Sequence, residues 1–173
     1  MIKSVVGASI LNIVTESLYD KPIVVFREYV QNASDSLSSV ATDANKDSLC
    51  CRIWLKDSNL YFLDNGAGIA ADEFLSKMES IAFSGKDKAT NIGYKGIGRL
   101  SGISYCEKLR FVNIIDYNNS VFQEYEIDCA KYVELQKSDT YNEMSFSELM
   151  AIIVAIKEDG DTACIAETIN QYS

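Results

Sequence analysis

Three side chains with acid–base or metal-binding chemistry occur close together after residue 21, namely Glu28, Asn32 and Asp35. In an α-helix these spacings place them within about 60° of one another, so they share one helix face. A carboxylate can take up a proton, so the triplet could carry acid–base chemistry. The same spacing also suits a solvated polar stripe opposite Phe26 and Tyr29, so the triplet alone leaves both interpretations open.

Two glycine-rich segments add further candidate chemistry. The first, Asp64-Asn65-Gly66-Ala67-Gly68, joins a carboxylate to glycines that would let a flat ring lie against the backbone. Its aspartate can accept a hydrogen bond from an exocyclic amine, although Asp-Asn-Gly is also an ordinary turn. The second reads IGYKGIG over residues 92–98, and it suits either a phosphate cradle or a flexible surface loop.

The composition limits the possible reaction classes. The chain has 173 residues and no histidine, so Ser-His-Asp and Cys-His nucleophile systems are excluded and carboxylates or lysines must carry any proton transfer. No two of the five cysteines form a CxxC pair, and we expect reduced, mostly buried thiols. These cysteines are Cys50, Cys51, Cys106, Cys129 and Cys164.

The charge and hydropathy patterns bear on partners and location. A formal charge of -9 with scattered basic residues disfavours nucleic-acid binding. No apolar stretch is long enough to span a membrane, and the first 20 residues carry Glu16 and Asp20 rather than a signal peptide, so we expect a cytoplasmic protein. The length fits one domain covering residues 1–173.

The hydrophobic pattern alternates helices with hairpins. We expect helices over the first 20 residues, from residue 21 to about 37, over 72–82, over 99–106 and over 145–157. The second of these should bury Val25, Phe26, Tyr29, Val30, Ala33 and Leu37. Strands are expected over 49–55, 60–63, 108–117, 121–127 and 162–165, with turns at 56–59 and 118–120. The pattern predicts an α+β fold with helices packed on one face of the sheet.

The helix with the polar triplet, the Asp64 turn and the glycine cluster follow one another in an order that resembles the GHKL superfamily of ATPases. This superfamily includes DNA gyrase, heat-shock protein 90 chaperones, MutL-type repair proteins and sensor histidine kinases. Residues 27–37, REYVQNASDSL, look nearly residue for residue like the nucleotide helix of the heat-shock protein 90 chaperones, and residues 81–85, IAFSG, look like the start of their mobile lid. Histidine kinases fit poorly, because the phosphoacceptor histidine is absent.

The resemblance implies a Bergerat-type two-layer α+β sandwich with a mixed, mostly antiparallel sheet that binds Mg²⁺ with ATP. By position it makes Glu28 the catalytic base, Asn32 the Mg²⁺ ligand, Asp64 the acceptor for the adenine amine, and Asp35 a support for the nucleotide-facing helix surface. The remaining nucleotide-binding residues that it implies are Ser36, Gly66, Gly68, Ile69, Ser84, Gly85, Gly93, Tyr94, Lys95, Gly96, Ile97, Gly98, Arg99 and Thr162.

The sequence departs from the chaperone pattern at a few positions. Phe83 replaces a usual basic residue, while Lys95 and Arg99 replace aromatic residues around the glycines, which indicates a more highly charged phosphate end. These differences put a chaperone-like lid closure in doubt. Thr162 either completes the adenine pocket or belongs to an ordinary turn before an edge strand.

The function implied is slow ATP hydrolysis, weak in the isolated domain, with lid closure driving a chaperone-like change or homodimerisation of a longer protein that acts on client proteins. One alternative is an ATP-binding switch module that barely hydrolyses the nucleotide. Another is a DNA-repair or topoisomerase clamp, which the acidic charge disfavours.

Overall fold

The computed structural model describes residues 7–13, 21–80, 98–116, 119 and 121–158. The chain divides into two compact units. The helix–hairpin unit comprises residues 14–68 and 80–102, and the sheet unit comprises residues 1–13, 69–79 and 103–173. The candidate site residues Ser84, Gly85, Gly93, Tyr94, Lys95, Gly96, Ile97 and Thr162, and the predicted strand 162–165, lie outside the described residues.

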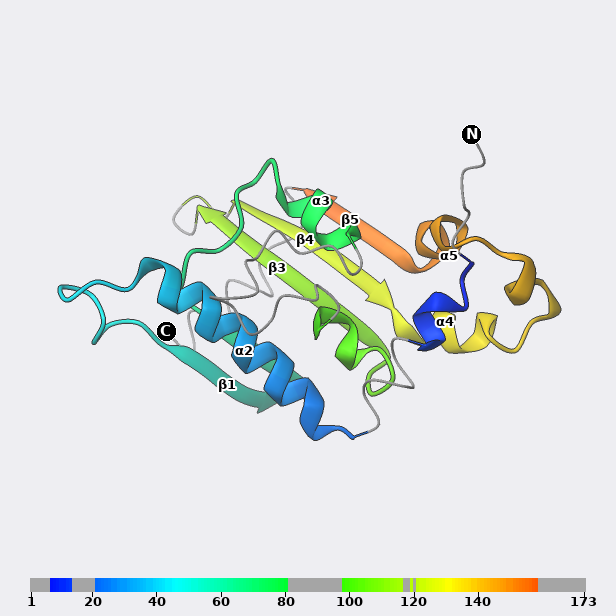
Figure 1. Cartoon of the computed structure of the whole chain (residues 1–173), viewed down its shortest axis with the longest axis horizontal. Coiled ribbons are helices and arrows are strands. Elements are labelled where there is room, and N and C mark those ends of the chain that lie inside the picture. The colour runs from blue at the N-terminus through cyan, green and yellow to red at the C-terminus, as the bar shows by residue number, and fades with distance from the viewer. Residues whose placement is uncertain (1–6, 14–20, 81–97, 117–118, 120, 159–173) are drawn as a thin grey trace. The chain divides into compact units, whose positions relative to one another are not determined.

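The helix–hairpin unit contains a long helix against a two-stranded antiparallel hairpin (Figure 1). Its elements are α2 (Ile23–Val40), β1 (Cys51–Lys56), β2 (Asn59–Asp64) and the short 3-10 helix η1 (Gly98–Gly102). The rings of Phe26 and Tyr29 lie edge-on to Phe62 of β2, with centroids 5.6 and 5.2 Å apart. Aromatic contacts therefore join the helix to the hairpin.

Two details of this unit differ from the predictions. Val25 and Ala33 are buried as expected, but Phe26 and Val30 are 38% and 41% exposed, because the hairpin covers only part of the predicted apolar side of α2. A helix was predicted over 99–106, but the structure has the short 3-10 helix η1 (Gly98–Gly102). The prediction was therefore wrong in helix type and in length.

The hairpin turn follows the sequence closely. Asp57 and Ser58 have positive φ angles of 48° and 64°, which is the geometry of a two-residue turn matched to the twist of its strands. Lys56 pairs with Asn59 directly beside this turn. The predicted hairpin is confirmed.

The sheet unit is built on three antiparallel strands in the order β3-β4-β5, which lie side by side in Figure 1. Its elements are α3 (Phe74–Glu79), β3 (Lys108–Asp116), β4 (Val121–Asp128), α4 (Cys129–Leu135), the 3-10 helix η2 (Asp139–Glu143), α5 (Phe146–Ile153) and β5 (Val154–Glu158). The core is formed largely by Phe74, Phe122, Tyr125, Ile127, Leu149 and Ile153. Antiparallel hairpins interleaved with helices confirm the predicted α+β class.

The sheet unit also corrects three element predictions. The apolar run 145–157 is a helix only to Ile153, because the chain then turns extended at Val154 and pairs with β4. The helix expected over 72–82 is limited to α3 (Phe74–Glu79), and α4 and η2 were not predicted. The expectation of mostly buried cysteines is wrong for the described four, since Cys129 alone is buried.

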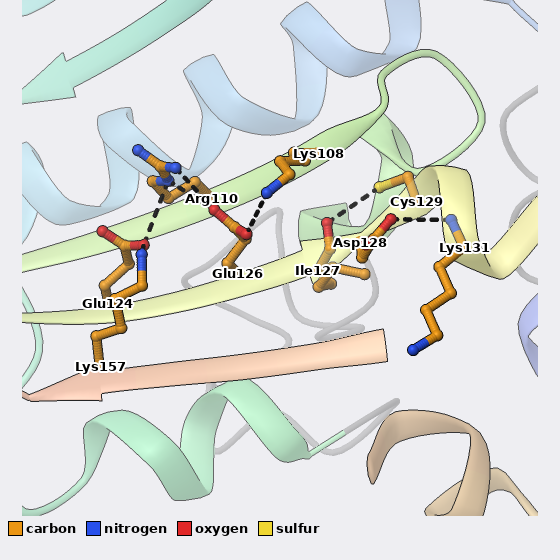
Figure 2. Close-up of polar contacts among 9 residues, drawn as sticks. All are labelled: Lys108, Arg110, Glu124, Glu126, Ile127, Asp128, Cys129, Lys131 and Lys157. Atoms are coloured by element: carbon orange, nitrogen blue, oxygen red, sulfur yellow. Dashed lines mark hydrogen bonds and ion pairs between the residues drawn. The ribbon is translucent and has the colours of Figure 1, made fainter. Parts of the chain in front are cut away.

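One face of the three-stranded sheet carries a ladder of ion pairs (Figure 2). Glu126 accepts hydrogen bonds from Lys108 at 2.9 Å and Arg110 at 2.7 Å, and Glu124 accepts one from Lys157 at 2.9 Å. Burial would raise the pKa of Glu126, but the hydrogen bonds from Arg110 and Lys108 outweigh it and lower that pKa. Both glutamates have low exposure, and each carboxylate is paired with at least one cation, which offsets the cost of burying its charge.

No helix in the described part of the chain has the length and apolar character that crossing a membrane would need.

Candidate functional site

Helix α2 displays the predicted polar residues at successive turns of one face. Glu28, Asn32 and Ser36 are spaced by four residues and are all half-buried. With a rise of about 1.5 Å per residue, Glu28 and Ser36 lie roughly 12 Å apart along the helix axis. The two ends of this face therefore form separate polar sites.

The Asp64 turn meets α2 at Ser36. The Ser36 hydroxyl donates to Asp64 Oδ1 at 2.8 Å, and the Gly66 backbone N–H donates to the same oxygen at 3.0 Å. None of the hydrogen bonds in the described part of the chain uses Asp64 Oδ2, and the residue is exposed. One carboxylate oxygen is thus held by the protein, while the other remains available to an outside donor.

Gly66 allows the turn to rest directly on the main chain of α2. A Cβ atom at this position would lie 2.6 Å from the backbone carbon of Ser36 and 2.7 Å from the backbone nitrogen of Leu37. The neighbouring Ala67 N–H donates to the Ser36 carbonyl at 3.3 Å. A side chain at position 66 would force the two backbone segments apart, which explains the glycine physically.

At the other end of the face, Glu28 meets the last glycine of the cluster. A Cβ atom at Gly98 would overlap Glu28 Oε2 and lie 3.2 Å from Glu28 Cδ. Glu28 Oε1 accepts hydrogen bonds from Arg27 Nη2 at 2.8 Å and Arg27 Nε at 3.3 Å. Gly98 leaves room for the carboxylate, and Arg27 orients it through one oxygen.

Asn32 lies between these two ends. Its side chain makes no hydrogen bond to any other described residue, whereas Asp35 accepts one from Gln31 Nε2 at 3.0 Å. Across the described ranges, no three His, Cys, Asp or Glu side chains gather where they could hold a metal by themselves. A cation at Asn32 would therefore take most of its oxygen ligands from water or a bound anion, as Mg²⁺ commonly does.

Several positioning contacts were not predicted. The Tyr29 hydroxyl donates to the Arg99 carbonyl at 3.0 Å, which ties η1 to α2. The Asn65 side chain accepts from Cys50 N–H at 2.8 Å and donates to the Ser48 carbonyl at 2.9 Å, which anchors the Asp64 turn to the approach to β1. A tyrosine on a helix and an asparagine within a turn carry no sequence signal for such distant partners.

The chain that continues the Asp64 turn is anchored in the sheet unit. Asn113, which is buried, accepts from Ile69 N–H at 3.1 Å and donates to the Ile69 carbonyl at 2.8 Å. Gln123 donates to the Ala71 carbonyl at 2.9 Å. The side-chain amides of Asn113 and Gln123 thus bind backbone groups of residues 69–71 that a neighbouring strand would otherwise bind.

Three further residues predicted to bind the nucleotide, Gly68, Gly98 and Arg99, lie in the described part of the chain. Gly98 lies beside Glu28, and Gly68 has a φ of 62° at the end of the Asp64 turn. Arg99 Nη2 donates to the Ser80 carbonyl, so this cation joins the two described ends of the segment 81–97. The phosphate-binding role expected for Arg99 stays a prediction.

The chain is similar to one protein family and to several curated chaperones. Residues 21–159 match the family described as histidine kinase-, DNA gyrase B- and HSP90-like ATPase. The chaperone protein HtpG of Polaromonas sp. (strain JS666) is 32% identical over 124 residues, covering 59% of this chain and 20% of HtpG. The mitochondrial TNF receptor-associated protein 1 homolog of Dictyostelium discoideum is 32% identical over 111 residues, covering 51% of this chain and 16% of that protein. The chain spans about one fifth of the length of the curated relatives it matches.

Proposed function

This chain belongs to the histidine kinase-, DNA gyrase B- and HSP90-like ATPases, and from that membership we propose that it binds ATP along the polar face of α2. The observation that carries this proposal is that two separate sequence segments meet one face of α2. The Asp64 turn contacts α2 at Ser36, and the glycine cluster contacts it at Glu28. The spacing of about 12 Å suits a nucleotide with its base at one end and its phosphates at the other.

The adenine end is the Ser36–Asp64 pair. Asp64 Oδ1 is occupied by Ser36 and Gly66, so Oδ2 faces the incoming ring and accepts its exocyclic amine. A charge-assisted hydrogen bond of this kind is stronger than one between neutral groups. The open backbone of the Asp64 turn lets the flat ring approach closely.

Asn32 is the residue of this face that would hold Mg²⁺ bound with the phosphates. The amide oxygen of Asn32 would supply one hard ligand to the cation, and phosphate and water oxygens would supply the others. When bound, the cation neutralises charge on the phosphates. Asn32 contributes by fixing where that charge lies along α2.

Hydrolysis follows from the position of Glu28. Arg27 holds Oε1, and Oε2 takes one proton from a water as the water oxygen bonds to the γ-phosphorus and the bond to the ADP oxygen breaks. The products are ADP and phosphate. With no histidine in the chain, a carboxylate is the natural base at this site.

The expected substrate preference provides the direct test. Titration of the purified chain with ATP, ADP and GTP, each with and without Mg²⁺, should show adenine nucleotides binding at least about tenfold more tightly than GTP. Guanine presents a carbonyl where adenine has its amine, so it would place an acceptor against the Asp64 carboxylate. Equal affinity for ATP and GTP, or no binding of either, would contradict the proposed site.

Closure of a lid over the nucleotide is the second proposed step, on the resemblance of residues 81–85 to the start of a chaperone lid. We expect amide hydrogen exchange over residues 84–95 to slow when a saturating non-hydrolysable ATP analogue is added to the full chain. Exchange over residues 130–135 of α4 serves as the reference. Equal exchange over 84–95 with and without the analogue would count against a lid.

In a longer protein, we propose that closure of the lid over ATP drives homodimerisation and a chaperone-like conformational change that acts on client proteins. The proposed location is the cytoplasm. The alternative is a nucleotide-binding switch that holds ATP and barely hydrolyses it. Turnover measured against affinity distinguishes the two. A protein that binds ATP tightly without turnover, also when joined to its natural downstream domains, is a switch.

A further inference from the structure

The sheet unit contains a pair of thiols that ATP binding and hydrolysis do not use. Cys106 Sγ lies 3.8 Å from Cys129 Sγ. The backbone N–H groups of Cys129 and Ala130 both donate to the Glu107 carbonyl, at 2.9 and 3.0 Å. Cys106 lies two residues before β3 and Cys129 directly after β4, so both lie at the same end of the β3–β4 pair, where Lys108 is paired with Asp128.

We propose that Cys106 and Cys129 form an oxidative modification site in which hydrogen peroxide first oxidises Cys106 and Cys129 then closes a disulfide with it. The two thiols differ in access in the way that this order requires. Cys106 is exposed, so a small oxidant in solvent can reach it. Cys129 has 0% exposure and can react only with a neighbour inside the protein.

The hydrogen bond between the thiols also sets their reactivity. It lowers the pKa of Cys106 and outweighs the opposing effect of partial desolvation, which remains because the residue is exposed while its sulfur rests against Cys129. It is also the main cause of the raised pKa of Cys129, with burial second. Because the thiolate is the nucleophile, Cys106 reacts before Cys129. The pKa of Cys51 is raised by burial and then by Asp64 and Cys50, which makes it a slower competitor.

The chemistry balances with hydrogen peroxide as the only oxidant. The Cys106 thiolate attacks one peroxide oxygen, an S–O bond forms, the O–O bond breaks, and the hydroxide released takes up a proton to become water. Cys106 is then a sulfenic acid, oxidised by two electrons. Cys129 sulfur attacks Cys106 sulfur, the S–O bond breaks, and the departing hydroxide takes the Cys129 proton, giving a disulfide and a second water.

The second step is helped by the first. Once Cys106 is a sulfenic acid, the thiolate that raised the pKa of Cys129 is gone, so Cys129 ionises more readily. The sulfur atoms must approach by about 1.8 Å to reach bonding distance, which side-chain rotation at the end of a strand pair can supply.

Peroxide treatment of the reduced full chain tests the site. Intact mass should fall by two hydrogen atoms, and a non-reducing digest should contain one linked peptide pair joining Cys106 to Cys129. In Cys129→Ser the reaction should stop at a sulfenic acid on Cys106, which dimedone traps. In Cys106→Ser the disulfide should be lost, while Cys51→Ser, the matched control, should form it as the parent does.

A folded parent whose Cys106 and Cys129 stay unlinked under peroxide would overturn the proposal. Faster dimedone labelling of Cys50 or Cys51 than of Cys106 in Cys129→Ser would also overturn it. Because Cys129 is buried, the linked-peptide measurement on the parent decides the matter even if its variants fail to fold.

Discussion

Replacing Glu28 by alanine should reduce ATP hydrolysis by at least about a hundredfold while leaving ATP affinity within a few-fold. A positioned general base contributes about 10²- to 10⁴-fold to a rate, and its removal takes away little ground-state binding. Glu28 Oε1 is bound by Arg27 and Oε2 lies beside Gly98, at the end of the α2 face where we propose that the phosphates bind. Single-turnover hydrolysis and equilibrium binding of a non-hydrolysable analogue measure the two quantities separately.

Two companion variants sharpen this test. Gly98→Ala would push a Cβ atom against Glu28 Oε2, the far end of a flexible side chain, so we expect a folded protein whose hydrolysis falls a few-fold because the carboxylate is displaced. Gly7→Ala is the matched control, since its Cβ would meet only Ser9 Oγ at an ordinary 3.6 Å. Glu134→Ala, an exposed glutamate of α4, controls for loss of a carboxylate elsewhere. Parent-like hydrolysis by Glu28→Ala would remove Glu28 as the base.

Replacing Asp64 by asparagine should lower ATP affinity by at least about tenfold while preserving the fold. The asparagine oxygen can keep both hydrogen bonds that Oδ1 accepts, from Ser36 and Gly66, which places the amide NH₂ where Oδ2 was. Two donors, the amide and the adenine amine, would then face each other. Loss of a charge-assisted hydrogen bond costs roughly 1.5 to 3 kcal/mol, and about 1.4 kcal/mol corresponds to a tenfold change in affinity.

Calorimetric titration with ATP, together with thermal unfolding, measures both parts of this prediction. Asp47→Asn is the matched control, because Asp47 is exposed and its side chain makes no hydrogen bond or ion pair with other described residues. Ser36→Ala should give a smaller loss, since it removes one of the two donors that orient Asp64 and leaves its charge. If Asp64→Asn is folded and binds ATP like the parent, the adenine end of the site lies elsewhere.

Local patterns predicted much of this molecule because they depend on neighbours a few residues apart. Helical periodicity identified α2 and the shared face of Glu28 and Asn32, and turn-forming residues identified the hairpin at Asp57 and Ser58. The order of three short motifs was enough to predict the family that the comparison then established. None of these inferences needed knowledge of distant contacts.

Element ends were predicted less well, because competing partners decide them. Residues 154–157 continue an apolar helical pattern, yet they belong to β5. Pairing with β5 satisfies the backbone N–H and C=O groups along one edge of β4, which would stay unpaired if the helix continued. Phe26 and Val30 match the apolar side of α2, but their exposure depends on how far the hairpin extends over the helix. Periodicity states which side is apolar and not how much of it is covered.

The sequence alone thus determined which residue types were available for the proposed nucleotide chemistry, and the tertiary structure decided which of them lie in contact. Ser36 reaches Asp64 across 28 positions, and the Tyr29 hydroxyl reaches the Arg99 carbonyl across 70. Cys106 meets Cys129 only because β3 and β4 pair in one register. Such contacts arise when the whole chain packs, because burial and backbone pairing bring distant segments to distances that no local pattern encodes.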